Sequence, residues 1–349
     1  MINLYELDEI TLLPSATNNG HLGADINYLQ TDELDLTGYS KTLPIFTLPS
    51  PSIVGKSSVK SYSDAGIRSI LPSTEDINTR LEYCAWIFCA FTVAEIKRYF
   101  LGNKRNSDSQ FHICIDAGNG HDISLLKIGN DLKKIYGNQV LLMGGNIEHP
   151  DAYELYSNAG FDYVRVGQAG AHMSNRDKYG FYYPLGSLLN DIKEEKARQK
   201  NKTLRPVKII ADGDVYSNSD ILKCIALGAD YVMIGREFAR VLEAEGEIMM
   251  KTGKNEETPI DKSTLPRDMD KYKIKSNCIS RYYKGCVSTD QNAGDTKFET
   301  GWEKISIRLN LQEWIDEFNE CAYYAFMMTG AKNWNEYKEK IRYAITTMV

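Results

Sequence analysis

The sequence lacks an uninterrupted apolar stretch of the roughly 18 residues that a membrane-spanning helix needs, so we expect no membrane partner. It also lacks an excess of basic residues: the formal net charge is -6 and the isoelectric point is about 5.6. This balance gives no electrostatic reason to expect nucleic acid as a partner. An anionic ligand must therefore be bound by local geometry. The opening residues, MINLYELDEITLLP, lack the basic segment of a secretory signal, and we expect a cytoplasmic protein.

Cysteine is sparse and irregularly spaced. The seven cysteines are an odd number, and no two of them have the short repeated spacing of a zinc site. Several lie inside apolar runs, which is typical of reduced, buried thiols in a cytosolic protein. We therefore expect neither a disulfide framework nor a bound metal.

The stretch 208–239, KIIADGDVYSNSDILKCIALGADYVMIGREFA, is the most informative part of the chain. Two apolar runs each end in a glycine-bearing turn, the first at Asp212 and Gly213, the second at Gly235 and Arg236. An amphipathic segment of helical length separates them. In a parallel barrel such turns lie side by side, where backbone N–H groups can hold a phosphate. Asp212 is placed to accept hydrogen bonds from a sugar diol.

Eight short apolar or β-branched runs alternate with amphipathic segments over much of the chain. With 42% hydrophobic and 25% charged residues, this alternation predicts an α/β fold, a (β/α)8 TIM barrel forming one domain over residues 1–349. A long insertion after the eighth run, 247–304, is expected to be a mobile flap within that domain. The eight runs are residues 43–48, 67–71, 86–91, 112–117, 140–144, 163–167, 207–212 and 231–235.

Three segments are expected to form helices, and the first illustrates the helical periodicity. Residues 122–135 are expected to gather their apolar side chains on one side, followed by a stop at Gly137. Residues 309–327 and 334–347 are expected to close the chain as helices. The apolar side of the first helix is expected to comprise Ile123, Leu126, Ile128, Leu132 and Ile135.

Polar, glycine-rich turns follow three successive runs. Residues 116–121 read DAGNGH, residues 144–146 read GGN, and residues 167–176 read GQAGAHMSNR. Each turn alone is ordinary for a barrel. Because they follow successive strands, we expect them to line one catalytic face.

Several motifs together resemble the inosine monophosphate dehydrogenase and guanosine monophosphate reductase family. The resemblance covers nearly the whole chain and is greatest to the reductase branch, because no regulatory module interrupts it. The motifs are YELDEITLLPS from Tyr5, CIDAGNGH from Cys114, LLMGGNI from Leu141, GFDYVRVG from Gly160, the ADGD and MIGR turns, YYKGC from Tyr282 and FETG from Phe298.

The resemblance implies a homotetrameric oxidoreductase that acts on IMP or GMP with NADP or NAD, and that binds a purine nucleoside monophosphate across the barrel mouth. The implied catalytic residues are Asp116, Asn175 and Glu299, where Glu299 reads the purine edge and helps to protonate a leaving amine. Asp116 also lies on the nicotinamide side, together with Asn119. The implied substrate-binding residues are Asn146 and Asp212 at the ribose, Gly213, Gly235, Arg236 and Tyr283 at the phosphate, Gly285 at the base, and Gly170.

The chain departs from the family pattern in the loop after the sixth run. The family's catalytic cysteine, whose thiolate attacks the purine carbon, is replaced by Met173, and a thioether cannot form that adduct. The family's loop is rich in glycine and closes on a monovalent cation. Most of these glycines are absent here, so a monovalent-cation site is not expected. A threonine of the family is replaced by Asn175.

The phosphate turns depart from the family as well. Asp214 stands where the family has glycine, and Arg236 stands where it has a small hydroxylic residue. The two side chains could pair with each other, or Arg236 could bind the phosphate bidentately. Near the first strand, residues 48–50 read LPS in place of the family's serine-proline-methionine.

Alternatives for the nucleophile remain. Cys286 follows Gly285 near the base and could replace the missing thiol. The favoured interpretation, however, is that Cys286 is a small apolar residue at a position where the family has methionine. His172 could act as an acid or base, but a plain loop role is favoured.

Three functions follow from these observations. The first is a nicotinamide-dependent purine nucleotide oxidoreductase whose covalent step is displaced or absent. The second is a different enzyme that acts on a modified purine nucleotide without covalent cysteine catalysis. The third is a catalytically silent, nucleotide-binding or regulatory homologue.

Overall fold

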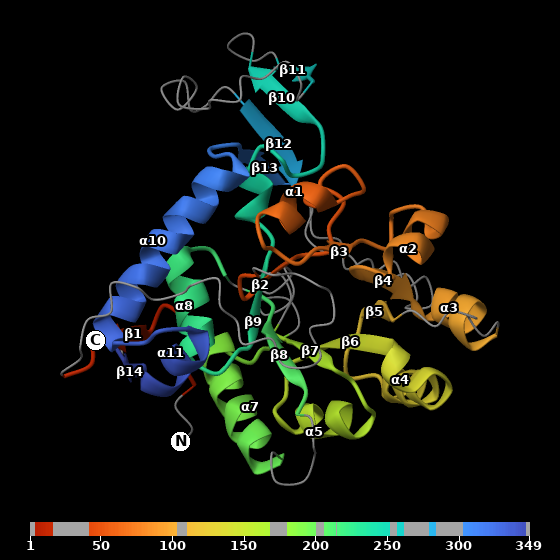
Figure 1. Ribbon diagram of the computed structural model, residues 1–349, viewed down its shortest axis with the longest axis horizontal. Helices are drawn as coiled ribbons and strands as arrows, with labels where there is room; N and C mark the ends of the chain where they lie inside the picture. The colour runs from red at the N-terminus through yellow and green to blue at the C-terminus, as the bar shows by residue number, and fades with distance from the viewer. Residues whose placement is uncertain are drawn as a thin grey trace.

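The protein is described by a computed structural model that places residues 4–16, 42–102, 110–167, 180–199, 206–213, 215–251, 257–261, 279–283 and 303–346. Its largest element is an eight-stranded parallel sheet in the order β2-β9-β8-β7-β6-β5-β4-β3. The two ends of the sheet meet through a parallel bridge between Phe46 and Arg68. The Thr47 amide donates to the Arg68 carbonyl at 2.8 Å, which closes the barrel. The predicted (β/α)8 barrel is confirmed (Figure 1).

Each of the eight predicted runs overlaps one barrel strand, and five of them contain it completely. Parallel strands that are covered on both sides read as continuous apolar stretches, which is why the sequence shows them clearly. The barrel elements are β2 (Ile45–Thr47), α1 (Val59–Asp64), β3 (Ile70–Leu71), α2 (Ile77–Tyr83), β4 (Phe88–Thr92), α3 (Val93–Ile96), the π-helical turn η1 (Lys97–Leu101), β5 (Phe111–Asp116), α4 (Ile123–Tyr136), η2 (Gly137–Gln139), β6 (Val140–Ile147), α5 (Asp151–Asn158), β7 (Tyr163–Val166), α7 (Leu185–Gln199), β8 (Lys208–Ala211), α8 (Asn218–Ala226), β9 (Tyr231–Ile234) and the 3₁₀ turn η3 (Phe238–Arg240).

A layer of aromatic side chains fills the interior of the barrel near the end where its strands begin. Phe46 packs edge-on against Phe88 and Tyr231 with ring centroids 6.0 and 5.2 Å apart. Phe88 packs edge-on against Tyr163 at 5.3 Å. Such edge-to-face contacts add to the stabilisation from buried area. These rings fill the barrel near the end where its strands begin, so a binding site is expected at the other end, where the strands finish.

Helix α4 exists as predicted, but the side that it buries differs. Asp122 caps it by accepting from the Ser124 amide at 2.8 Å, and Gly137 ends it with a φ of 56°. Ile123 is 79% exposed. At about 100° per residue, Ile123 lies on the side opposite Leu132, so the predicted set does not share one face. The buried positions of α4 are Leu125, Ile128, Gly129, Leu132 and Tyr136.

The chain ends differ from the sequence prediction. Helix α10 (Leu311–Thr329) begins with a capping box between Asn310 and Glu313, and α11 (Trp334–Lys340) follows it. The predicted helix over 334–347 was wrong beyond residue 340. Strand β14 (Arg342–Ile345) replaces its last part and pairs antiparallel with β1 (Ile10–Leu13). Tertiary pairing with the other end of the chain overrides the local helical pattern here.

A second, four-stranded antiparallel sheet occupies part of the long insertion; we call it the flap sheet. It comprises β10 (Ile248–Lys251), β11 (Glu257–Ile260), β12 (Ile279–Tyr283) and β13 (Glu303–Ser306), in the order β11-β10-β12-β13. Figure 1 shows it at the top of the view, above α1. The sequence pattern of 247–304 does not predict these strands. Their small apolar cluster of Ile248, Ile279 and Ile307 is separate from the main core.

Arg281 of β12 anchors the flap sheet to the barrel. Its side chain is fully buried, and its guanidinium donates to the carbonyls of Ala239 at 3.0 Å, Val241 at 2.7 Å and Leu242 at 3.1 Å. Burial lowers the pKa of Arg281 to about 10. A buried cation needs such hydrogen bonds to offset its lost hydration. The root of β12 is thereby fixed to the segment that follows β9.

The five cysteines that the structure describes are free thiols, and Cys84, Cys89, Cys114 and Cys224 are buried, as expected. Among the described helices, none is long and apolar enough to cross a membrane.

Candidate functional site

Three predicted site residues lie where barrel strands end. Asn146 near the end of β6 donates its amide to Asp212 Oδ2 at 2.8 Å. Asp212 follows β8 directly and is 2% exposed. Gly213, which follows it, has a φ of 138°, a conformation that L side chains rarely adopt. The structure thus brings together the residues that the sequence assigned to a ribose and a phosphate.

Arg165 of β7 lies between the two strands and was missed by sequence reasoning. Its Nη1 lies 3.9 Å from Asp212 Oδ2, and the two side chains are 5% and 3% exposed. Its Nη2 donates to the carbonyls of Ile115 at 3.3 Å and Gly145 at 3.2 Å. The available signal was a charged residue inside the buried run YVRV, because a buried charge requires a partner. Arg165 is the counterion of Asp212.

The charge of Asp212 depends on this neighbour. Burial raises the pKa of the Asp212 carboxyl above its ordinary value, while the Arg165 guanidinium and the Asn146 hydrogen bond act in the opposite direction. Because the folded-state pKa is raised, the folded protein binds this proton more tightly than the unfolded chain. The free energy of unfolding therefore falls as pH rises from the ordinary carboxyl pKa through the folded-state pKa.

Arg165→Met is expected to lower the free energy of unfolding by about 3–5 kcal/mol at pH 7, because it leaves a buried carboxylate unpaired. The loss is expected to be smaller at pH 5, where Asp212 can take up a proton and the buried charge disappears. Urea unfolding at both pH values measures this difference. In an Asp212→Asn background the same substitution should lose its pH dependence. An equal loss at both pH values in the single variant would contradict the pairing.

Asp116 ends β5 on the same side of the barrel. It is 8% exposed, and the Ser73 hydroxyl, from the turn after β3, donates to its Oδ2.

The neighbouring Cys114 is also buried, and burial raises the pKa of its thiol to about 11. The Arg165 guanidinium lowers this pKa, while the Asp116 and Asp212 carboxylates raise it. A thiol with this pKa is a poor nucleophile near neutrality. The buried Cys114 thiol therefore has neither the exposure nor the low pKa that are typical of a reactive cysteine.

The glycine-rich turn after β5 packs against Asn146. A Cβ on Gly120 would lie 2.1 Å from the Asn146 carbonyl oxygen, so only glycine fits there. The Tyr156 hydroxyl donates to the Gly120 carbonyl at 2.7 Å. Asn119, predicted at the cofactor, is exposed, and its Oδ1 accepts the His121 amide at 2.9 Å. This turn is thus shaped to lie beside the Asn146–Asp212 pair.

The second phosphate turn has an unexpected side-chain partner. Arg236, which follows Gly235 after β9, donates its Nε to Glu303 Oε2 at 3.2 Å and its Nη2 to Glu303 Oε1. The pKa of Arg236 is raised, chiefly by this hydrogen bonding to Glu303. The sequence suggested Asp214 or a phosphate as the partner of Arg236; Asp214 lies outside the described residues, and the partner that the structure describes is Glu303. Glu303 begins β13 and lies opposite Tyr283 of β12 in the strand register, so the flap sheet reaches the cradle here.

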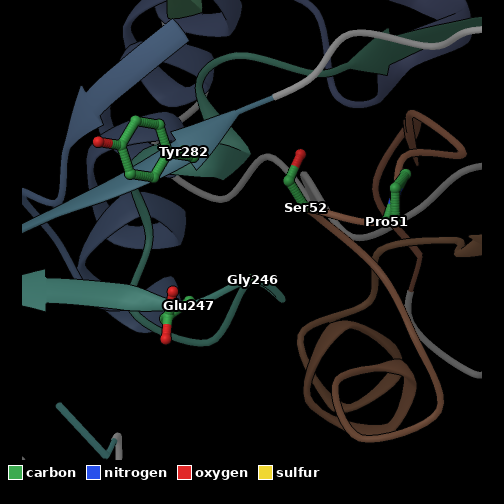
Figure 2. Close-up of a pocket in the computed structure, with 5 residues that line it drawn as sticks. All are labelled: Pro51, Ser52, Gly246, Glu247 and Tyr282. Atoms are coloured by element: carbon green, nitrogen blue, oxygen red, sulfur yellow. The ribbon is translucent and has the colours of Figure 1, made fainter. Parts of the chain in front are cut away.

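A pocket of about 300 Å³ lies at the root of the flap sheet, lined by Pro51, Ser52, Gly246, Glu247 and Tyr282 (Figure 2). Tyr282 and Glu247 come from the flap side, and Pro51 and Ser52 come from the loop after β2. The Ser50 and Ser52 hydroxyls are hydrogen-bonded at 2.8 Å. The sequence assigned no role to this pocket.

The remaining predicted site residues lie outside the described ranges, and their predictions stay as stated. They are Gly170, Met173, Asn175, Asp214, Gly285, Cys286 and Glu299, together with the alternative His172; for Tyr283 only the backbone is described.

The closed barrel, with a carboxylate and glycine turns at the strand ends, defines a (β/α)8-barrel protein with a polar site at its mouth. The family model for the IMP dehydrogenase / GMP reductase domain matches residues 95–349. The chain belongs to the IMP dehydrogenase / GMP reductase family.

Individual relatives agree with this assignment. The chain is 32% identical to a GMP reductase of Streptococcus gordonii over 182 residues, which are 51% of this chain and 47% of the relative. It is 33% identical to an inosine-5'-monophosphate dehydrogenase of Chlorobaculum parvum over 144 residues, or 41% and 28% of the two chains. The chain thus spans less than half the length of these curated relatives.

A solved structure agrees in fold. The inosine 5' monophosphate dehydrogenase of Legionella pneumophila superposes with a TM-score of 0.74 over 99% of both chains, at 20% sequence identity. At this identity the likeness supports the barrel architecture alone.

Proposed function

We propose that the chain binds a purine nucleoside 5'-monophosphate across the mouth of the barrel. The observation that carries the proposal is the buried Asp212 carboxylate, which Asn146 and Arg165 hold beside the glycine turn. The carboxylate would accept hydrogen bonds from the ribose hydroxyls. The amides of Gly213 and Gly235 would donate to the phosphate. The names of the relatives supply the purine, since they are enzymes of IMP and GMP.

The proposed class of reaction is nicotinamide-dependent oxidoreduction of IMP or GMP, with NADP or NAD as cofactor. The proposed place for the nicotinamide is the turn after β5, where Asn119 is exposed and the Asp116 carboxylate accepts the Ser73 hydroxyl. Asp116 and Asn119 would contact the nicotinamide, which when bound would accept or supply a hydride. Glu299 keeps its proposed role in protonating a leaving amine, and Asn175 stays among the proposed catalytic residues.

The covalent step of the family is not part of this proposal, because Met173 cannot act as a thiolate nucleophile. A displaced nucleophile at Cys286, a noncovalent reaction and a silent binding subunit remain open. Family membership also supports a cytoplasmic homotetramer, which light scattering would test by the mass of the assembly.

Titration calorimetry tests the binding proposal. IMP or GMP is expected to bind, and the corresponding nucleoside is expected to bind at least tenfold more weakly, because it cannot form charge-assisted hydrogen bonds at the glycine turns. Uridine monophosphate has the same ribose and phosphate and is the control for the base. Absence of heat with both purine monophosphates would contradict the proposal.

A further inference from the structure

The ion pair between Arg236 and Glu303 lies at the proposed phosphate site. Arg236 follows Gly235 at the end of β9, on the face where Asp212 and Gly213 end the adjacent strand β8. Both nitrogen contacts of the pair reach the two oxygens of one carboxylate. This is the same bidentate geometry that a guanidinium uses for a phosphate. Glu303 therefore occupies the binding face of an arginine that lies at a proposed phosphate site.

The flap sheet determines where Glu303 lies. Its strand β13 pairs with β12, and Glu303 is the partner of Tyr283 in that register. Strand β12 is fixed by Arg281 to the carbonyls of Ala239 and Val241, three to five residues after Arg236. The carboxylate is thus presented to Arg236 by an element anchored to the same stretch of chain. A chance contact between two surface side chains explains this position of Glu303 less well.

The pair is also accessible. The Arg236 side chain is 36% exposed and that of Glu303 is 48% exposed, so water screens their attraction and the pair contributes little to stability. A phosphate dianion held by the neighbouring amides would carry more charge than the carboxylate. The phosphate could therefore displace Glu303 from the Arg236 guanidinium. The freed Glu303 carboxylate would then repel the phosphate.

We propose that Glu303 competes with the ligand's phosphate for Arg236, so that this pair sets how strongly the site prefers a nucleotide to a nucleoside. The inference rests on the proposed function and specifies the recognition of its phosphate. Arg236 is the specificity-determining group, and Glu303 is an internal competitor that mimics the ligand. With the pair closed, the Glu303 carboxylate offsets the charge of the Arg236 guanidinium.

Two substitutions separate this role from a purely structural one. Glu303→Gln is expected to tighten binding of GMP about tenfold, because the neutral amide competes poorly for the guanidinium. Arg236→Gln is expected to weaken binding of GMP by about tenfold or more. Binding of guanosine should stay unchanged in both variants. Calorimetry with GMP and with guanosine gives the four values.

The matched control is Glu257→Gln. Glu257 also pairs with a cation of the flap sheet, Lys304, but does not contact Arg236. It should leave both affinities unchanged. If Glu303→Gln weakens GMP and guanosine alike, the pair is only a structural link and the inference is overturned; unchanged GMP affinity overturns it as well. Absence of GMP and IMP binding in the unsubstituted protein would instead refute the proposed function.

Discussion

Asp212→Asn is expected to weaken binding of IMP and GMP by at least two orders of magnitude. The substitution preserves shape but removes the charge that strengthens hydrogen bonds to the two ribose hydroxyls. Each such bond to a charged group contributes about 1.5–3 kcal/mol, and every 1.4 kcal/mol is about tenfold in affinity. Calorimetry against the unsubstituted protein measures the change.

Asp162→Asn is the matched control. Asp162 is also held by a cation, Lys133, at 2.7 Å, and accepts the Leu142 amide at 2.8 Å. It precedes β7 and therefore lies at the opposite end of the barrel. Its substitution should lower stability and leave the nucleotide affinity unchanged. If Asp212→Asn binds GMP as tightly as the unsubstituted protein, the ribose assignment is wrong.

Met173→Cys is expected to increase nicotinamide-dependent turnover of IMP or GMP by roughly three orders of magnitude or more, since loss of a covalent nucleophile has effects of that size. The introduced thiolate would restore attack on the purine carbon. The absorbance of the reduced cofactor follows turnover, and intact-protein mass spectrometry detects a nucleotide adduct. The unsubstituted protein should form no adduct at residue 173.

Met173→Ser controls for the change in size and polarity at this position. A hydroxyl is far less acidic than a thiol, so this variant should show neither the adduct nor the gain in turnover. If Met173→Cys binds nucleotide but remains inactive, the missing nucleophile is not what limits the reaction. The site would then belong to a different reaction or to a silent binding protein.

Most of the barrel was predictable because its information is local. Each strand is buried on both sides and reads as a short apolar run, and the turns at strand ends carry the glycines that close backbone contacts require. Gly120 shows the second point, since its contact with the Asn146 backbone excludes any side chain. Asp212 and Gly213 were predicted from their turn for the same reason, whereas Asn146 was assigned to the ribose through the family resemblance; these roles remain predictions.

The features that the sequence did not predict depend on distant partners. Arg165 has its charged partner, Asp212, directly after the next strand, and Arg236 contacts Glu303 across a sequence separation of 67 residues. Strand β14 exists because β1 pairs with it. The flap strands are short, and part of their surface is exposed, so their apolar pattern is weak. Local periodicity contains no information on any of these pairings.

The Arg281 anchor has a consequence for sequence variation. Its three hydrogen bonds go to main-chain carbonyls at residues 239, 241 and 242, which every amino acid carries. The side chains at those positions can change without loss of the attachment, provided that the backbone path is kept. Arg281 itself has no equivalent, because lysine presents a single nitrogen where the guanidinium presents a fork. Tolerance to mutation is therefore unequal on the two sides of this junction, broad on the barrel side and narrow at one residue of the flap.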